Sequence, residues 1–396
     1  MATDYQKIDK KHYLPTYKRF SLTITKGKGS KVWDSEGNEY IDALAGIAVN
    51  SLGHSHPKVV EAIKNQAEKL IHISNFYLTE PQALLSEKLA ELSGMPRVFF
   101  GNSGAEANEG AIKIARKYAH TNNRGGEIIS FEGCFHGRTL ATIATGKLSM
   151  QQGFEPIPAG FKTAPFNDIE TLKSMISEQT AAIIIEPIQG EGGINVVDKK
   201  FMKQIRTLCD ENNIVLIFDE IQCGVGRTGY FFAKEYFGIQ PDILTSAKAL
   251  GSGVPISAIL TTEKISEVIK PGDHGTTFGG NALATAASLA AVNTIEQENL
   301  PKQATEKGKW FINKIKENNP EAIGIKEIRG MGLMLGFEFD REAKPIVEEM
   351  MKNGVLANAT ADTVLRIVPP LNISYEDLQT VVEVMIKSAK KVRKNA

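Results

Sequence analysis

The sequence lacks any apolar run close to the roughly 20 residues that a membrane-spanning helix needs, so a helical membrane protein is not expected. It also lacks an excess of charge of one sign, because 46 Lys and Arg residues balance 46 Asp and Glu residues. We therefore predict no basic face for nucleic acid or for an anionic membrane. Residues 1–5 show no charged-then-apolar signal pattern, which favours a cytoplasmic protein.

Cysteine is scarce as well. The three cysteines, Cys134, Cys209 and Cys223, are an odd number without the spacing of a metal site, and we expect them to stay reduced. The seven histidines are scattered along the chain, so no metal site is predicted. Neither a Gly-x-Gly-x-x-Gly nor a Walker pattern follows the strand at residues 97–100, which disfavours a dinucleotide or nucleoside-triphosphate site there.

What the sequence does contain is typical of a soluble globular enzyme, with 42% hydrophobic and 23% charged residues. A chain of 396 residues is long for a single core. The alternation of strand and helix patterns predicts an α/β fold with a mostly parallel sheet. We expect an N-terminal arm with a small hairpin over residues 1–54, a large domain over 55–284, and a helical and stranded C-terminal part over 285–396.

Lys248 is the first candidate catalytic residue. It lies among the small residues 245–253, directly after the apolar residues Ile243 and Leu244 that predict a short buried strand. A lysine at the end of such a strand is partly desolvated, which lowers its pKa. A neutral amine can form a Schiff base with a carbonyl cofactor. The alternative is an ordinary lysine on a glycine-rich surface loop.

Asp219 follows a second apolar run at residues 214–218, which predicts a central parallel strand. Ligands of open α/β sheets gather at the carboxyl ends of strands. Burying a carboxylate without a partner costs several kcal/mol. Asp219 therefore needs a cation, and a protonated pyridine nitrogen is a suitable one. A helix cap or a metal ligand are the alternatives, and no histidine nearby in the sequence supports the metal.

Two more strands end in polar residues. The run at residues 181–185 leads into Glu186, and the run at 97–100 leads into Ser103, Gly104 and Ala105, which open an alanine-rich helix. Such a turn presents free backbone N–H groups to an anion, and glycine allows a close approach. An ordinary capped strand-to-helix turn is the alternative, and a single phosphate monoester is the ligand that suits the turn best.

A Schiff-base lysine, a carboxylate for a ring nitrogen and a phosphate cradle together resemble the fold-type I pyridoxal-phosphate enzymes, and among them the class III, ornithine-type aminotransferases. The resemblance runs from residues 27–34 to residues 365–371, and its most specific part joins residues 219–222, residues 226–229 and Lys248. It implies a seven-stranded, mostly parallel sheet in a large domain, a smaller α+β domain built from both termini, and pyridoxal 5'-phosphate as the cofactor.

The resemblance also implies roles around the cofactor. Lys248 would carry the Schiff base and move the proton between substrate and cofactor, and Asp219 would face the ring nitrogen. Gln222 would lie near the phenolic oxygen, and Phe135 would stack on the ring, although core packing is the commoner role of a phenylalanine. The phosphate would bind at Ser103, Gly104 and Ala105.

Further implied roles concern the substrates and the second subunit. Arg138 resembles the arginine that binds the α-carboxylate, which a guanidinium fork matches in geometry. Arg366 and Glu191 resemble an ion pair that opens for the second carboxylate of 2-oxoglutarate, where a static salt bridge is the alternative. Thr277 resembles a hydroxyl that reaches the phosphate of the neighbouring subunit, with Thr276 near the substrate, so a homodimer with shared sites is implied.

Three segments bear on specificity. Tyr17 matches a tyrosine near the substrate carboxylate, and Ile47 stands where plain ornithine enzymes carry tyrosine. Residues 72–77 and 80–82 look most like the acetylornithine branch of the family. We therefore expect transfer of the side-chain amino group of an acylated ornithine, preferably acetylated, to 2-oxoglutarate. Succinylornithine, ornithine or 4-aminobutyrate as donor, an aminomutase, and a non-catalytic homologue remain the alternatives.

Overall fold

A seven-stranded sheet forms the centre of the larger part of the molecule in the computed structural model, which describes residues 4–394. Strand β12 is antiparallel to both of its neighbours, and the other adjacent pairs are parallel. The predicted mostly parallel, seven-stranded sheet is thus confirmed. In spatial order the strands are β4 (Arg97–Gly101), β12 (Ser257–Thr261), β11 (Ile243–Ser246), β10 (Val215–Asp219), β7 (Thr180–Ile185), β5 (Glu127–Phe131) and β6 (Phe161–Ala164).

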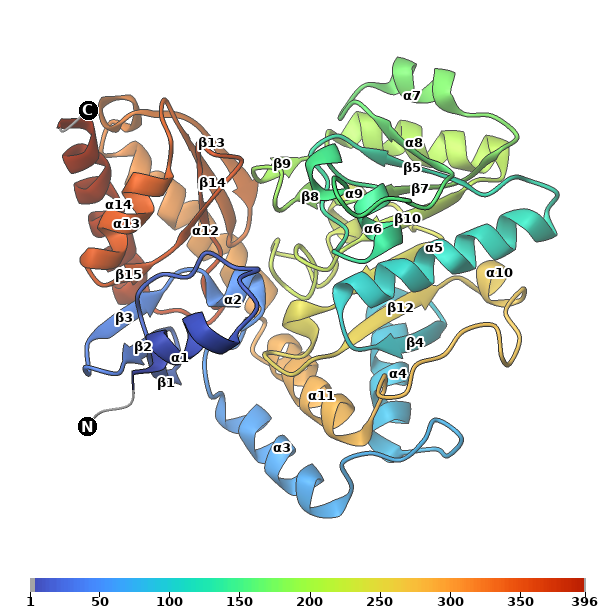
Figure 1. Cartoon of the computed structure of the whole chain (residues 1–396), viewed down its shortest axis with the longest axis horizontal. Helices are drawn as coiled ribbons and strands as arrows, with labels where there is room; N and C mark the ends of the chain where they lie inside the picture. The colour runs from blue at the N-terminus through green and yellow to red at the C-terminus, as the bar shows by residue number, and fades with distance from the viewer. Residues whose placement is uncertain (1–3, 395–396) are drawn as a thin grey trace.

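The central strands are continuous apolar runs because helices cover both faces of the sheet. Every residue of β7, β10 and β11 is buried. Side chains of α5 (Gly104–Thr121) pack with Ile217 on one face, whereas side chains of α8 (Lys199–Asn212) pack with Leu216 and Phe218 on the other. Figure 1 shows the sheet between these two helices.

The remaining helices lie around the sheet and at the two ends of the chain (Figure 1). Those of the first half are α1 (Tyr5–His12), α2 (Ala45–Ala48), α3 (Pro57–Lys69), α4 (Glu80–Ser93), α6 (Leu140–Ala144) and α7 (Ile169–Met175). Those of the second half are α9 (Lys234–Phe237), α10 (Glu263–Ser266), α11 (Ala282–Gln297), α12 (Leu300–Lys316), α13 (Lys344–Lys352) and α14 (Tyr375–Lys394). Among the helices of residues 4–394, none is long and apolar enough to cross a membrane.

Both ends of the chain contribute to the smaller sheets. The predicted N-terminal hairpin is present as β2 (Lys31–Asp34) and β3 (Glu39–Asp42), and β15 (Val355–Leu356) pairs with β3. Figure 1 accordingly shows the first strands beside α13 and α14. The predicted domain limits at residues 54 and 284 stay a prediction. The other strands are β1 (Ile24–Lys28), β8 (Ile188–Gln189), β9 (Asn195–Val196), β13 (Ile325–Met331), β14 (Met334–Phe339), β16 (Asn358–Thr360) and β17 (Val364–Ile367).

A buried arginine joins the large sheet to both ends of the chain. Arg227 has no exposed surface, and its guanidinium donates to the carbonyl oxygens of Leu333 and Pro369 and to Ser51 Oγ, at 3.1, 2.5 and 3.2 Å. Burial lowers its pKa to about 9. A buried cation without hydrogen-bond partners is costly in free energy. These hydrogen bonds therefore favour one arrangement of the segments that contain Ser51, Leu333 and Pro369 around Arg227.

Candidate active site

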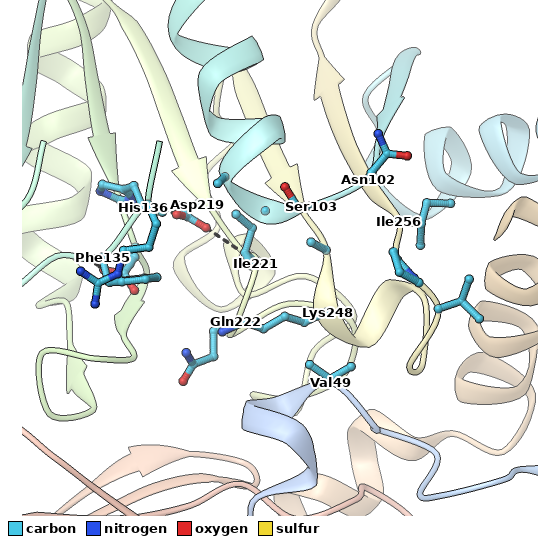
Figure 2. A pocket seen from close by; sticks show the side chains of 18 of the residues that line it. Val49, Asn102, Ser103, Phe135, His136, Asp219, Ile221, Gln222, Lys248 and Ile256 are labelled. Carbon is cyan, nitrogen blue, oxygen red and sulfur yellow. Dashed lines mark hydrogen bonds and ion pairs between the residues drawn. The ribbon is translucent and has the colours of Figure 1, made fainter. Parts of the chain in front are cut away.

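A cavity of about 380 Å³ lies at the carboxyl ends of the central strands, where an open α/β sheet gathers its ligands. This volume falls in the range of small-molecule sites. Figure 2 shows side chains from several segments around it. Of the residues singled out in the sequence, those that line the cavity are Ser103, Gly104, Ala105, Phe135, Arg138, Asp219, Gln222 and Lys248.

Lys248 lies two residues beyond β11 and opens a short 3-10 helix, Lys248–Leu250. Its φ of +47° is in the left-handed region, which is uncommon outside glycine and is typical of strained functional positions. Burial lowers the pKa of the amine to about 8; the charge of Glu191 works against this shift, whereas the charge of Arg366 adds to it. The lowered pKa agrees with the sequence prediction and makes the neutral, nucleophilic amine accessible near neutral pH.

Asp219 ends β10 and is 3% exposed. Its Oδ2 accepts hydrogen bonds from His136 Nδ1 at 2.7 Å and from Asn108 Nδ2 at 2.8 Å, and its Oδ1 accepts from the backbone N–H of Ile221 at 3.0 Å. Although burial opposes it, the pKa of His136 is raised well above its ordinary value by Cys134 and by Asp219. This network fixes the Asp219 carboxylate at the wall of the cavity.

The histidine partner of Asp219 was not predicted from the sequence, because no histidine is close to Asp219 along the chain. The fold brings His136 from the segment after β5 to the end of β10. Its position directly after Phe135 was the available signal. One histidine and one carboxylate do not make a metal site, and residues 4–394 contain no group of three or more His, Cys, Asp or Glu side chains placed for a metal ion.

The turn before α5 has the form of an anion cradle. Ser103 is the N-cap of this 18-residue helix, and its Oγ accepts a hydrogen bond from the Glu106 N–H at 3.2 Å. The first turn of a helix leaves backbone N–H groups free and carries a partial positive charge. A Cβ added to Gly104 would come within 2.9 Å of the Ile221 side chain, so a larger residue at position 104 would crowd the cradle.

Phe135 and Arg138 lie on the segment that follows β5. The Phe135 N–H donates to Glu186 Oε2 at 3.0 Å, which holds the backbone of this segment. The Arg138 guanidinium lies 5.2 Å from the centre of the Phe135 ring, and the arginine side chain is exposed. Ile221, which the sequence analysis did not single out, also lines the cavity (Figure 2).

The predicted Glu191–Arg366 pair is formed. Arg366 Nη1 donates to Glu191 Oε1 at 2.5 Å and to Gln222 Oε1 at 3.1 Å. Arg366 is fully buried, whereas the Glu191 side chain is 34% exposed. Burial works to raise the pKa of Glu191, but the charge of Arg366 and its hydrogen bond prevail and lower it. Gln222 connects the pair to the cavity that it lines.

Six predicted residues do not line the cavity of this chain: the paired Glu191 and Arg366, and the four residues Tyr17, Ile47, Thr276 and Thr277. Tyr17 is 71% exposed, and Ile47 lies in α2 with a φ of +65°. Thr276 is half-buried and accepts a hydrogen bond from Asn102 Nδ2 at 3.1 Å, while Thr277 is exposed. The roles assigned to these four residues stay predictions.

Glu186 was noted in the sequence only as the end of a strand, yet it lines the cavity. Its carboxyl accepts the backbone N–H groups of Phe135 and Gly190, at 3.0 and 3.1 Å. Burial raises its pKa to about 7. Its place at the end of a buried apolar run, like that of Asp219, was the signal. Val49 also lines the cavity and carried no such signal.

These residues fit pyridoxal phosphate. The helix N-terminus at Ser103 and Gly104 suits the phosphate, the Asp219 carboxylate suits a protonated ring nitrogen, and the Lys248 amine suits the aldehyde. Phe135 and Ile221 offer apolar surface to a flat ring. Each of these groups therefore has the charge or polarity that the matching part of this ligand requires.

Comparison with known proteins supports this interpretation. The family model for class-III aminotransferases matches residues 13–389. The chain is 54% identical to the acetylornithine aminotransferase of Methanocaldococcus jannaschii, over 98% of both chains. It is 48% identical to that of Caldanaerobacter subterraneus, over 95% of this chain and 97% of the relative.

Solved structures agree. An ornithine aminotransferase from Toxoplasma gondii, whose active site is described as partly occupied by pyridoxal phosphate, has a TM-score of 0.95 at 35% identity, covering 99% of this chain and 95% of that one. An acetylornithine aminotransferase from Elizabethkingia anophelis has a TM-score of 0.87 at 34% identity, with 98% of each chain covered. Over nearly its whole length, this chain therefore belongs to the class-III aminotransferases, which are pyridoxal-phosphate-dependent transaminases.

Proposed function

We propose that the chain transfers the side-chain amino group of N-acetylornithine to 2-oxoglutarate, giving N-acetylglutamate 5-semialdehyde and glutamate. The observation that carries this proposal is the arrangement of Lys248, Asp219 and the cradle before α5 around one cavity, with the Glu191–Arg366 pair beside it. The substrate assignment is supported by the names of the relatives, which over nearly the full length are acetylornithine aminotransferases.

Lys248 acts at the start and at the centre of this reaction. Bound pyridoxal phosphate supplies an aldehyde that takes up amino groups and a ring that accepts the electron pair released at the reacting carbon. Lys248 Nζ, with a pKa lowered to about 8, would hold the aldehyde and would move the proton at the reacting carbon. Asp219, fixed by His136 and Asn108, would hold the protonated ring nitrogen.

Arg138 and Arg366 bind the two kinds of carboxylate. Arg138 lies next to Phe135 at the cavity and binds the α-carboxylate of N-acetylornithine. When this donor is bound, the Glu191 carboxylate pairs with Arg366. When 2-oxoglutarate is bound, the second carboxylate of 2-oxoglutarate takes the place of the Glu191 carboxylate at Arg366. A buried arginine without any partner would be costly in free energy, which favours such an exchange.

The active form of the chain is a homodimer with shared sites. Phe76 and Leu78 are 93% and 97% exposed, and Phe278, next to Thr277, is 61% exposed. Large exposed apolar side chains of this kind mark a surface that another chain covers. Covered in this way, Thr277 reaches the phosphate of the partner. The three buried free cysteines agree with a cytoplasmic location.

The test is a half-reaction screen. The protein loaded with pyridoxal phosphate is mixed separately with N-acetylornithine, N-succinylornithine, ornithine and 4-aminobutyrate, and loss of the near-visible absorption is followed. The fastest conversion, by at least about tenfold, is expected for N-acetylornithine. Faster conversion of ornithine or 4-aminobutyrate would overturn the substrate assignment while leaving the family intact.

A further inference from the structure

The Glu191–Arg366 pair lies against β16, a short strand without an assigned role. Asn358 of β16 and Arg366 of β17 are direct cross-strand partners. Asn358 Oδ1 accepts a hydrogen bond from Arg366 Nε at 3.1 Å. Two residues further along the same strand, Thr360 Oγ1 donates to the backbone carbonyl of Glu191 at 2.6 Å. One strand therefore contacts both members of the pair.

The backbone around Glu191 is held at further points. The Gly190 N–H donates to Glu186, at 3.1 Å, and Arg329 Nε donates to the carbonyl oxygen of Gly193 at 2.7 Å. With Thr360 between these two contacts, the backbone of this loop has little freedom to move. Glu191 can therefore leave Arg366 by rotation of its own side chain, which is 34% exposed and has access to solvent.

Arg366 has to stay in place when Glu191 turns away. Its Nη2 is buried and has no hydrogen-bond partner among the described residues, so it is free to receive an oxygen of an incoming carboxylate. Its Nε is held by Asn358, and its Nη1 also by Gln222. Because an arginine nitrogen only donates, the Asn358 amide must present its oxygen. This neutral oxygen fixes the guanidinium plane without neutralising its charge.

We propose that Asn358 is a positioning residue that holds the Arg366 guanidinium ready for the second carboxylate of a dicarboxylic substrate, which the monocarboxylic donor lacks. Thr360 acts with it by confining the switch to the side chain of Glu191. The inference deepens the proposed function and rests on it, because it explains how one arginine serves a monocarboxylic donor and a dicarboxylic acceptor in turn.

The experiment compares the loaded wild-type enzyme with Asn358→Ala, Asn358→Asp and a control, Asn353→Ala. Asn353, at the end of α13, likewise accepts a hydrogen bond from a cation, Lys387 Nζ, at 2.8 Å, but its side chain bonds Glu349 and Lys387 and neither member of the Glu191–Arg366 pair. Binding of glutarate, an unreactive dicarboxylate, is measured by calorimetry. The kcat/KM of each half-reaction is measured separately with 2-oxoglutarate and with N-acetylornithine.

Asn358→Ala is expected to weaken glutarate binding and to raise the KM for 2-oxoglutarate about tenfold, as for a lost hydrogen bond to a charged group. The kcat/KM of the N-acetylornithine half-reaction should stay within about twofold of wild type, because Glu191 remains paired with Arg366 while this donor is bound. Asn358→Asp should weaken glutarate more than Asn358→Ala does, because its carboxylate neutralises Arg366 although it can still accept from Nε. The control should resemble wild type.

Equal losses for both half-reactions, or glutarate binding by Asn358→Asp as tight as by wild type, would overturn the role of Asn358. A purely structural role predicts the latter result, since aspartate retains the acceptor. If wild type fails to convert N-acetylornithine, the proposed function is wrong, and the glutarate measurements still judge Asn358 by themselves.

Discussion

At the scale of single residues, the site depends on what burial does to charges. The pKa of Lys248 is lowered because the amine is desolvated, and the Asp219 carboxylate is held in place by hydrogen bonds with His136 and Asn108. Both effects follow from the ends of buried strands. The sequence predicted the positions of Lys248 and Asp219 from apolar runs, but not His136 or Asn108, because pairing across distant segments depends on how the strands are ordered in the sheet.

The lowered pKa of Lys248 predicts a pH-dependent stability of the cofactor-free protein. The folded-state pKa of about 8 lies below the ordinary value of 10.5. Between these values the unfolded chain binds a proton at Lys248 that the folded chain does not, so the free energy of unfolding rises with pH. Relative to Lys248→Ala, wild type should gain at most about 3 kcal/mol between pH 7.5 and 10.5.

Denaturant unfolding of both cofactor-free proteins across this pH range measures the difference directly. A difference that does not change with pH would show that the Lys248 amine is solvated in the folded protein.

At the scale of elements, we expect the turn from β4 into α5 to decide where the phosphate binds. Ser103 caps the helix, and Gly104 leaves room beside Ile221. The sequence predicted this helix start from a serine and a glycine after an apolar run. It did not show that β4 lies next to the antiparallel β12, because strand order is a property of long-range pairing.

Gly104→Ala should weaken the binding of pyridoxal phosphate. The added methyl group would lie 2.9 Å from the Ile221 side chain, so that either the cradle or Ile221 has to shift. We expect a dissociation constant at least about tenfold higher, equivalent to about 1.4 kcal/mol, in a fluorescence titration of the cofactor-free protein.

Gly126→Ala is a matched control, because a Cβ at Gly126 meets only ordinary contacts of 3.5 Å or more. Wild-type affinity in Gly104→Ala would place the phosphate elsewhere than at the start of α5.

At the scale of the whole molecule, two parts of the chain meet around one cavity, and a second copy completes it under the proposed function. The sequence predicted the large sheet and the N-terminal hairpin. The positions of Tyr17, Ile47 and Thr277 relative to the cavity could not be worked out from it, since they depend on packing between parts of the chain or between copies. In this chain none of the three lines the cavity.

Shared sites predict complementation between two inactive variants. Lys248→Ala lacks the amine, and under the proposed shared site Thr277→Asp would place a carboxylate against the phosphate of the partner. In mixed dimers, a Lys248 from one chain meets an intact Thr277 from the other, and activity should return to about a quarter of wild type under random pairing of a two-fold dimer.

Activity is assayed after the two variants have been produced together, and each variant produced alone is the reference. Activity no higher than in the separate variants would refute the shared site.

Lys248 is the residue on which the whole account depends, and its bond to the cofactor can be observed directly. The protein loaded with pyridoxal phosphate is reduced with borohydride, digested, and analysed by peptide mass spectrometry. The account predicts a phosphopyridoxyl group on the peptide that contains Lys248 and on no other lysine. A label on a different lysine, or the same label in Lys248→Ala, would contradict it.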